Sequence, residues 1–222
     1  MQDVLLSRFA VLGDIHAEDK LLALSLGWLR ASRVERIFSV GDIVDGQGDA
    51  DRAVALLAAH RVEAVRGNHE RWWLDPEGTR VRHATPQDAL MPRGRYFLEM
   101  LPSSLVVETV VGAMLVCHAV GDDDMTRVLS HHSDNEIRST RAWARFIDEY
   151  PSVTVMVCGH THERMVRVLD GVTIINAGTL HRHDTPGFAV VDLALGEVVY
   201  HDLEVGGAVT LAERVRLSVA GR

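Results

Sequence analysis

Short polar clusters carry the clearest chemical signal in this sequence. Each cluster follows a short apolar run, and four of the five begin with a glycine, which lets the chain turn sharply after a strand. In an open α/β sheet, ligand-binding side chains gather at the carboxyl ends of strands, so we expect the clusters to converge on one site. The clusters are Gly13-Asp14-Ile15-His16, Gly41-Asp42-Ile43-Val44-Asp45, Gly67-Asn68-His69-Glu70, Cys117-His118 and Gly159-His160-Thr161-His162.

The residue types in these clusters indicate metal chemistry. Carboxylate, imidazole and amide ligands without thiolate suit divalent ions such as Mn²⁺, Fe²⁺ or Zn²⁺. The candidate ligands are more numerous than one ion with open coordination positions needs, so two ions that share one carboxylate are expected. Pairs of ions about 3.5–4 Å apart occur in phosphatases and nucleases. The candidate ligands are Asp14, His16, Asp42, Asn68, His118, His160 and His162.

The apolar runs before the clusters predict alternating strands and helices. In the first half, strands over 9–12, 36–40 and 62–65 alternate with helices over 21–29 and 50–59, which is typical of a mostly parallel sheet. Residues 71–103 contain four prolines and are expected to form a loop or a small helical insertion. The second half predicts a helix over 136–150 and strands over 105–109, 113–117, 153–158, 165–169, 172–175, 188–191 and 198–201. Two sheets with helices outside them give a layered α/β sandwich.

Charge narrows the classes of function. The 23 basic and 31 acidic residues leave a net charge of −8 at pH 7. This acidity argues against a nucleic-acid binder, which needs a basic face to displace counterions. An anionic substrate stays open, because bound cations reverse the local field.

Chain length and cysteine content restrict the possible classes of protein further. The length of 222 residues allows one or two domains, and we expect a single domain over 1–222 with an insertion at about 71–103. Cys117 and Cys158 are too few for a disulfide-stapled secreted domain, and we interpret both as buried thiols near the site. No apolar stretch reaches the ~20 residues of a membrane span, and residues 1–12 lack a signal-peptide pattern. We therefore expect a cytoplasmic protein that does not engage a membrane.

The clusters, in this order, resemble the signature of the calcineurin-like metallophosphoesterase superfamily. That signature is D-x-H, G-D-x-x-D, G-N-H-[DE], a lone H and G-H-x-H. The later Asn176-Ala177-Gly178-Thr179 segment is similar to the family's N-[PA]-G-[ST] turn, so the resemblance covers about three quarters of the chain. The resemblance implies a four-layer α/β/β/α sandwich with two mixed sheets, in agreement with the predicted elements.

The resemblance also implies a role for each cluster residue. The first of two divalent ions would be held by Asp14, His16, Asp42 and His162. The second would be held by Asp42, Asn68, His118 and His160, with Asp42 as the bridge. Manganese is the expected metal, with Fe, Zn or Ni as alternatives. His69 would be the general acid for the leaving oxygen, and Asp45 would orient it. A hydroxide that bridges the metals would attack the phosphorus in line.

The substrate is less well defined by the sequence. Phosphoprotein phosphatases carry an arginine after the second aspartate of their second motif, whereas Asp45 is followed here by Gly46. We therefore expect a small phosphorylated substrate, a phosphodiester or dinucleoside polyphosphate, with nucleotides among the candidates. A phosphomonoester or phosphoprotein is the alternative, and a non-catalytic metal-binding scaffold is a second class. The segment from Val65 to Glu70 resembles phosphoprotein phosphatases and symmetric dinucleoside tetraphosphatases.

Several of these residues also have purely structural explanations. Asp14 and Asp42 could cap helices, and His118 alone could be a core histidine. The run from Asp122 to Asp124 could be a solvated loop. Trp72 and Trp73 favour core packing over stacking on a base. The candidate substrate contacts are Arg66, Arg80, Arg82, Arg93 and Arg95, and a solvated surface explains the last four equally well.

The C-terminal segment over 211–219 alternates apolar and polar residues, as an edge strand does. Such a strand could pair with another chain, and the oligomeric state stays open.

Overall fold

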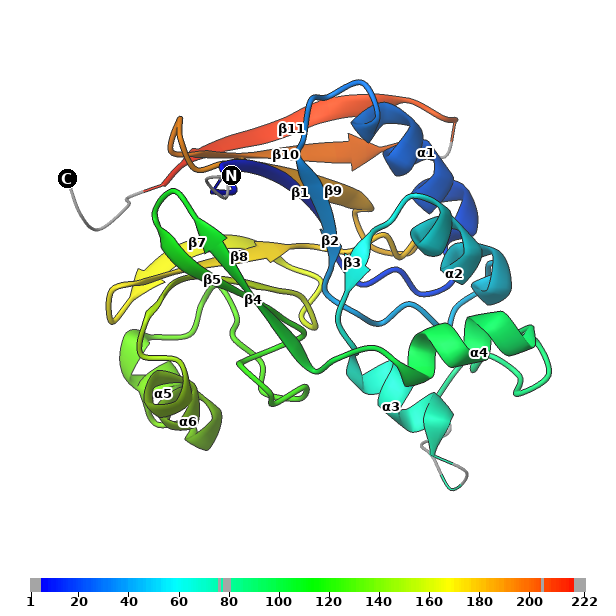
Figure 1. Cartoon of the computed structure of the whole chain (residues 1–222), viewed down its shortest axis with the longest axis horizontal. Coiled ribbons are helices and arrows are strands. Elements are labelled where there is room, and N and C mark those ends of the chain that lie inside the picture. Colours follow the sequence, from blue (N-terminus) through cyan, green and yellow to red (C-terminus); the bar gives the residue numbers. More distant parts are fainter. Residues whose placement is uncertain (1–4, 76, 78–80, 205, 218–222) are drawn as a thin grey trace.

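The computed structural model describes residues 5–75, 77, 81–204 and 206–217 (Figure 1). Within these residues the strands are β1 (Arg8–Leu12), β2 (Arg36–Ser39), β3 (Glu63–Ala64), β4 (Ser104–Thr109), β5 (Gly112–Cys117), β6 (Val153–Cys158), β7 (Arg164–Leu169), β8 (Val172–Ala177), β9 (Gly187–Asp192), β10 (Glu197–Leu203) and β11 (Val209–Arg216). The helices are α1 (Asp19–Leu29), α2 (Ala50–Ala59), α3 (Asn68–Leu74), α4 (Pro92–Glu99), α5 (Asp134–Arg138) and α6 (Arg141–Glu149). None of the described helices is long and apolar enough to cross a membrane.

Two mixed sheets form the centre of the molecule. The first has the strand order β11-β10-β9-β1-β2-β3, and the second has the order β4-β5-β6-β8-β7. In the first sheet, β1, β2 and β3 are parallel, whereas β9, β10 and β11 are joined by antiparallel pairs. In the second, β5, β6 and β8 are parallel and the outer strands β4 and β7 are antiparallel to their neighbours. The βαβ units predicted for the first half account for the parallel core of the first sheet.

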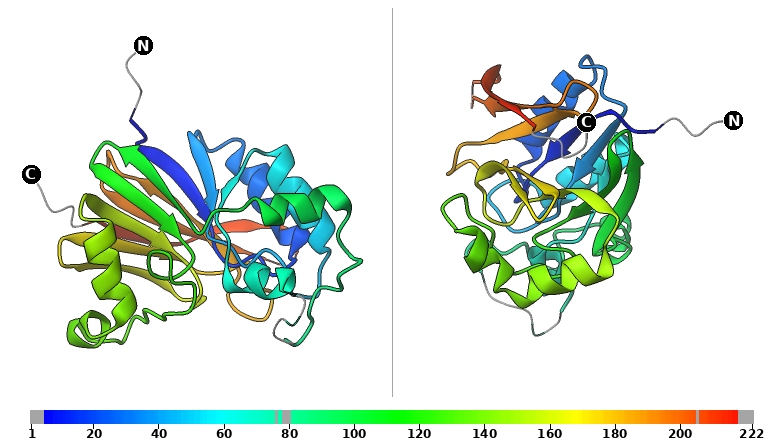
Figure 2. Two further views of the ribbon diagram at one scale, coloured as in Figure 1. Left: turned by 60° about the horizontal axis from the view of Figure 1, so that its bottom comes forward. Right: turned by 90° about the vertical axis from the view of Figure 1, so that its left-hand side faces the viewer.

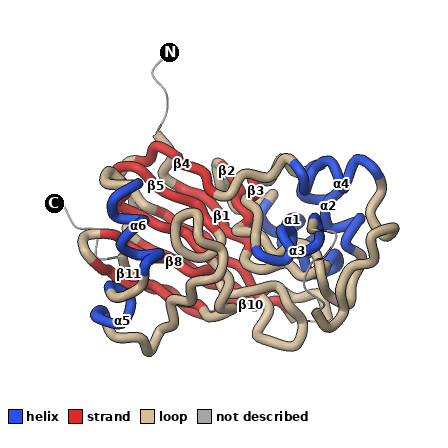
Figure 3. The backbone as a smooth tube through the Cα atoms, turned by 90° about the horizontal axis from the view of Figure 1, so that it is seen from below, coloured by secondary structure: helices blue, strands red, loops and turns tan. Residues whose placement is uncertain are grey.

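Helices cover the outer face of each sheet, which confirms the predicted four-layer α/β/β/α sandwich. Helices α1 to α4 gather on one side of the strands, and α5 and α6 lie on the other (Figures 2 and 3). Three buried apolar clusters fill the spaces between the layers. Leu22 of α1 and Leu57 of α2 belong to the cluster between these helices and the first sheet, and Val11 and Val157 to the cluster between the sheets. Phe146 of α6 belongs to the cluster between that helix and the second sheet.

The helix predicted over 136–150 is wrong as a single element. The structure has α5 and α6 in its place, separated at Ser139 and Thr140. The Oγ1 atom of Thr140 accepts a hydrogen bond from the backbone N–H of Trp143 at 3.2 Å, so Thr140 caps the start of α6. A threonine side chain that satisfies a free N–H at a helix start stabilises a new helix there.

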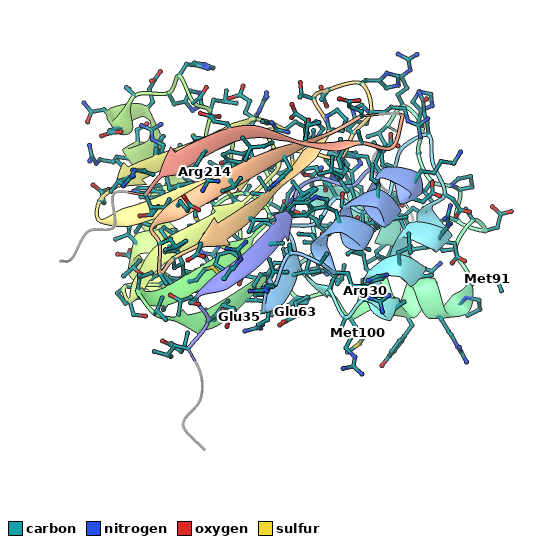
Figure 4. All side chains as sticks on the ribbon, turned by 90° about the horizontal axis from the view of Figure 1, so that it is seen from above. Arg30, Glu35, Glu63, Met91, Met100 and Arg214 are labelled. Carbon is teal, nitrogen blue, oxygen red and sulfur yellow. The ribbon has the colours of Figure 1, made fainter. Side chains whose placement is uncertain are left out.

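The described part of the segment over 71–103 contains helical structure. It holds the end of α3 and all of α4, and Pro92 opens α4 at a position where a missing N–H costs nothing. Trp73 is buried and donates its indole N–H to the carbonyl of Thr85 at 3.0 Å, so it packs in the core as expected. Met91 and Met100 lie exposed at the two ends of α4 (Figure 4).

The C-terminal segment forms an edge strand, as predicted for its described part up to Leu217. Among the described residues, strand β11 pairs with β10 alone. Arg214, which lies on β11 (Figure 4), binds Glu197 at 2.6 Å. Residues 218 and 219 of the predicted strand lie outside the described residues. Pairing of this edge with another chain stays a prediction.

Candidate metal centre

Loops at the carboxyl ends of five parallel strands bring the polar clusters together across both sheets. The loops follow β1, β2 and β3 in the first sheet and β5 and β6 in the second. Four groups result among the described residues, and in each the ligand-type atoms lie within 4.8 Å of one another. The first group is Asp14, His16 and His162, and the second is Asp42, His118 and His160. The first group holds three of the four residues that the family resemblance implies for one ion, and the second holds three of the four for the other. Asn68, the fourth residue of the second set, contacts His118. His16, Asp42 and His69 form a further group of this kind.

The backbone at the site is held in a conformation that side chains usually avoid. A left-handed backbone is unfavourable for residues other than glycine, and such residues cluster at functional sites. Here positive φ angles between 45° and 67° occur at His16, Asp42, Asp45, His160 and His162. The surrounding hydrogen bonds therefore stabilise an arrangement that the local sequence does not favour.

The imidazole rings of His16 and His162 face each other, and each directs an unprotonated ring nitrogen toward the other. The Nδ1 atom of His16 lies 2.9 Å from the carbonyl oxygen of Asp45, and Nδ1 of His162 lies 2.7 Å from a carboxylate oxygen of Asp184. Since both oxygens only accept, both Nδ1 atoms carry the protons. The two Nε2 atoms are then unprotonated in the neutral rings, and they lie 3.1 Å apart. Nitrogen ligands about 2.0–2.1 Å from one ion are separated by about 3.0–3.4 Å, so this pair fits a cation.

In the second group, too, hydrogen bonds fix the orientation of the histidine rings. Nδ1 of His118 donates to the carbonyl of Val40 at 2.8 Å, which turns its Nε2 toward Asn68 Oδ1 at 2.8 Å and Asp42 Oδ2 at 3.3 Å. Nε2 of His160 donates to the carbonyl of Met125 at 3.1 Å, so its Nδ1 is the free ligand atom. Backbone carbonyls that fix histidine tautomers are typical of metal centres.

Asp42 lies between the two groups. Its Oδ2 atom is 3.3 Å from Nε2 of His118 and 4.0 Å from Nε2 of His16, while Oδ1 accepts the backbone N–H of His69 at 3.0 Å. Burial opposes ionisation of Asp42, but His118 and the other nearby histidines outweigh it and hold the pKa of Asp42 well below its usual range. Burial also opposes protonation of His118, yet the charges of Asp42 and Asp14 raise its pKa to about 10. A field that attracts a proton this strongly also attracts a metal cation.

Glu70 holds the loops that carry the ligands, a role that the sequence did not predict. Its buried carboxylate accepts the backbone N–H groups of Asp42, Ile43 and Val44 at 2.6–3.0 Å and that of Gly67 at 2.9 Å. Burial, together with the charge of Asp42, raises the pKa of Glu70 to about 7 although the N–H groups favour the carboxylate. The carboxylate thereby ties the loop after β2 to the start of α3.

Gly67 is required for this contact between loops. A Cβ at position 67 would lie against the carboxylate and the backbone nitrogen of Asp42. Only a residue without a side chain allows the two loops to approach this closely.

His69 and Asp45 form the predicted pair. Nδ1 of His69 donates to Asp45 Oδ2 at 2.8 Å, and the other carboxylate oxygen accepts the backbone N–H of Thr85 at 2.7 Å. Burial disfavours the protonated ring, but the hydrogen bond to Asp45 and the charge of Asp42 raise the pKa of His69. The ring of Trp72 lies 4.9 Å from that of His69, so Trp72 borders the site whereas Trp73 does not.

The candidate arginines are dispersed. Arg66 lines a hollow of about 120 Å³ beside His118, together with Arg71 and the acidic loop. Arg95 pairs with Glu99 at 3.0 Å and packs over the ring of Trp73. Arg82 is exposed, Arg93 lines a hollow between α2 and α4, and Arg80 lies outside the described residues.

The structure also accounts for the acidic run over 122–124 and for the two cysteines. Asp124 binds the guanidinium of Arg71 at 2.6 Å and Asp122 accepts the hydroxyl of Ser103 at 2.7 Å, so the acidic run is partly an ordered loop. Cys117 and Cys158 are buried free thiols. Burial raises the pKa of Cys117 to about 12 and holds that of Cys158 well above its usual range, which keeps both protonated.

His181 and Asp184 join the site although the sequence reasoning missed them. With His162 they form a further group whose ligand-type atoms lie within 4.8 Å. The signal in the sequence was the run His181-Arg182-His183-Asp184, which follows the Asn-Ala-Gly-Thr turn by one residue. Polar residues so soon after a turn that borders the site are candidates for the same site.

Comparisons with known proteins agree with this architecture. The chain matches the calcineurin-like phosphoesterase superfamily domain over residues 8–196. It is similar to the crystal structure of a metallophosphoesterase from Sphaerobacter thermophilus, with a TM-score of 0.63, 24% identity, and coverage of 90% of this chain and 89% of that one. YfcE, a phosphoesterase from E. coli, has a TM-score of 0.57 at 14% identity, with 95% and 100% covered. Vps29 from Chaetomium thermophilum has a TM-score of 0.56 at 15% identity, with 95% and 98% covered.

At these identities the solved structures establish the fold, and no curated protein matches the chain. The family match spans the second sheet, strands β1, β2, β3 and β9 of the first sheet, and every polar cluster described above. The chain therefore belongs to the calcineurin-like phosphoesterase superfamily and is a metal-dependent phosphoesterase.

Proposed function

We propose that this enzyme hydrolyses a small phosphodiester or dinucleoside polyphosphate with two divalent cations, of which Mn²⁺ is the expected occupant. The observation that carries the proposal is the pair of facing Nε2 atoms of His16 and His162, 3.1 Å apart, with Asp42 between them and His118. Two groups of neutral nitrogens and carboxylates around one shared carboxylate suit two cations better than one.

In this proposal, His16 and His162 with Asp14 hold one cation, and Asn68, His118 and His160 hold the other. Asp42 contributes to both. Bound divalent cations supply an acidified water and withdraw charge from phosphoryl oxygens. The carboxylates offset part of the positive charge, and the fixed tautomers keep the ligand nitrogens directed at the cations.

His69 is the proposed general acid. Its Nδ1–H is held by Asp45, so a proton on Nε2 is free for the leaving oxygen. Nε2 lies 3.9 Å from Asp42 Oδ2, close to the shared carboxylate. Proton transfer by a positioned histidine contributes about 10²–10⁴-fold to a rate.

The neighbourhood of Asp45 supports a small substrate over a phosphoprotein. A Cβ at Gly46 would overlap the backbone carbonyl of His16, so an arginine at this position would require the loop to move. Trp72 beside His69 offers a flat ring on which a base or aryl group can stack. Two free thiols favour a reducing compartment, and we include the cytoplasm in the proposal on that ground.

The test compares two substrates on one enzyme. Metal-stripped protein is reconstituted with Mn²⁺ and assayed with bis(p-nitrophenyl) phosphate and p-nitrophenyl phosphate. We expect kcat/KM to be higher for the diester, and we expect Asp42→Asn to abolish most turnover while the fold persists. His69→Asn should lose much less activity with these two substrates, because p-nitrophenolate leaves without protonation. Glu99→Gln, which removes an exposed carboxylate on α4, is the matched control.

Each opposing result has a definite meaning. Preference for the monoester would overturn the diester assignment in favour of a phosphomonoesterase. Absence of turnover with two Mn²⁺ ions bound would contradict the proposal and favour a metal-binding scaffold.

A further inference from the structure

The loop over residues 180–186, between β8 and β9, borders the histidine cluster although it belongs to none of the five polar clusters. Both its backbone and a side chain form hydrogen bonds with the segment that follows β1. The backbone N–H of Leu180 donates to the carbonyl of Asp14 at 2.9 Å. The guanidinium of Arg182 binds the buried carboxylate of Glu18 through Nε at 2.6 Å and Nη2 at 2.8 Å. The loop is therefore ordered relative to the β1 loop that carries Asp14 and His16.

Asp184 contacts two histidines at once. Its Oδ2 atom accepts Nδ1–H of His162 at 2.7 Å and Nδ1–H of His181 at 3.0 Å. The first contact fixes the tautomer in which Nε2 of His162 faces His16. The second leaves Nε2 of His181 without a hydrogen bond within the described part of the chain.

His181 and Asp184 have the same arrangement as His69 and Asp45. In both pairs a carboxylate oxygen holds Nδ1, at 3.0 Å for His181 and 2.8 Å for His69. Both rings also pack edge-on against the ring of His16, with centroid distances of 5.4 Å and 4.8 Å. Both side chains are partly accessible, with 27% of His181 and 17% of His69 exposed. The site thus has two carboxylate-supported histidines beside His16.

We propose that Asp184 is a positioning residue for the metal ligand His162 and that His181 contacts the substrate through Nε2. This inference rests on the proposed phosphoesterase site and adds two residues to it. The chemical group that Nε2 of His181 meets is a phosphoryl oxygen or the leaving-group oxygen, since these are the polar atoms that the substrate class presents next to the metals.

A third cation bound by His162, His181 and Asp184 is the competing explanation. It would require His162 to use both ring nitrogens as ligands, and the short contact of Nδ1 with Asp184 is that of an N–H donor. The positioning role needs only the hydrogen bonds that the structure contains. Carboxylates that orient metal-bound histidines typically change metal affinity by about 10–100-fold when they are removed.

The first arm of the test measures Mn²⁺ binding to the metal-stripped protein by calorimetry and by the EPR signal of free Mn²⁺. We expect Asp184→Asn and Asp184→Ala to weaken one of two Mn²⁺ sites by about 10–100-fold and to leave the other unchanged. Asp134→Asn is the matched control, because Asp134 is a comparably exposed aspartate, 49% against 42% for Asp184, whose partner is an arginine and not a histidine of the site. Unchanged affinity at both sites would overturn the positioning role. A third equivalent of Mn²⁺ in the parent that Asp184→Ala loses would replace it by a metal-ligand role.

The second arm measures kcat and KM for the diester with saturating Mn²⁺. We expect His181→Asn to lower kcat/KM by about tenfold or more without changing Mn²⁺ affinity, whereas His183→Asn in the same loop changes neither. An unchanged kcat/KM in His181→Asn would overturn the substrate contact. If the parent enzyme itself turns over neither ester, the proposed function and the role of His181 both fail, while the Mn²⁺ titration still decides the role of Asp184.

Discussion

The carboxylate of Asp45 accepts Nδ1–H of His69 at 2.8 Å, and the backbone carbonyl of the same residue accepts Nδ1–H of His16 at 2.9 Å. One residue in a left-handed conformation, with φ of 63°, thus orients both a candidate general acid and a candidate metal ligand. The other carboxylate oxygen is held by the backbone N–H of Thr85, which comes from the helical insertion. The insertion therefore contributes to the geometry of the site as well as to its rim.

Substitution of His69 tests its role as general acid. We expect His69→Asn to lower kcat by about 10²–10⁴-fold for a diester with an alkoxide leaving group. The loss should be much smaller with p-nitrophenolate, which leaves without protonation. Asp45→Asn should show the same dependence on the leaving group with a smaller loss, since His69 remains. Equal losses for both leaving groups would contradict proton donation by His69.

Glu70→Gln tests the tie between the β2 loop and α3. Each carboxylate oxygen of Glu70 accepts two backbone N–H groups, so an amide nitrogen on either side would face two donors. We expect the free energy of unfolding to fall by about 2–4 kcal/mol, measured by urea denaturation of the metal-free protein. Glu99→Gln, at an exposed carboxylate, should change it little. A Glu70→Gln protein as stable as the parent would refute this role.

Gly67→Ala tests the close approach of two loops. The new methyl group would lie against Asp42, so the shared carboxylate must shift. We expect weaker Mn²⁺ binding and at least tenfold lower kcat, while far-UV circular dichroism stays the same. Gly27→Ala is the contrasting control: no atom lies within 4 Å of a Cβ there, and alanine in the last turn of α1 should stabilise the protein by up to about 0.5–1 kcal/mol. Full activity in Gly67→Ala would contradict the account.

His201 predicts a pH dependence of stability away from the site. Its ring is buried and stacks on Phe188, with centroids 5.0 Å apart, and burial together with the charges of Arg164 and Arg214 lowers its pKa. Because the unfolded state, with a pKa of about 6.5, then binds the proton more readily, stability is present above pH 6.5 and is lost as the pH falls through the folded-state pKa.

The check is urea denaturation between pH 7.5 and pH 5. We expect the parent to lose more stability on acidification than His201→Phe, which keeps an aromatic ring on Phe188 and cannot take up a proton. The same loss in both proteins would show that His201 is not the group responsible.

Much of the fold and of the site could be predicted from the sequence because local patterns determine them. The apolar runs before Asp14, Asp42 and His118 form the strands that these residues follow. The carboxyl ends of parallel strands lie at the same edge of a sheet, which brings such residues together. The break between α5 and α6 could not be predicted from apolar spacing, because it depends on one hydroxyl of Thr140. Asp184 could not be assigned to His162, since only the folded chain brings β6 and the loop after β8 together.

The central claim is that two cations bind around Asp42, and anomalous diffraction from crystals soaked in Mn²⁺ tests it most directly. The account predicts two anomalous peaks, one contacted by Asp14, His16 and His162 and the other by Asn68, His118 and His160, with Asp42 contacting both. A single peak, or peaks that Asp42 does not contact, would contradict it.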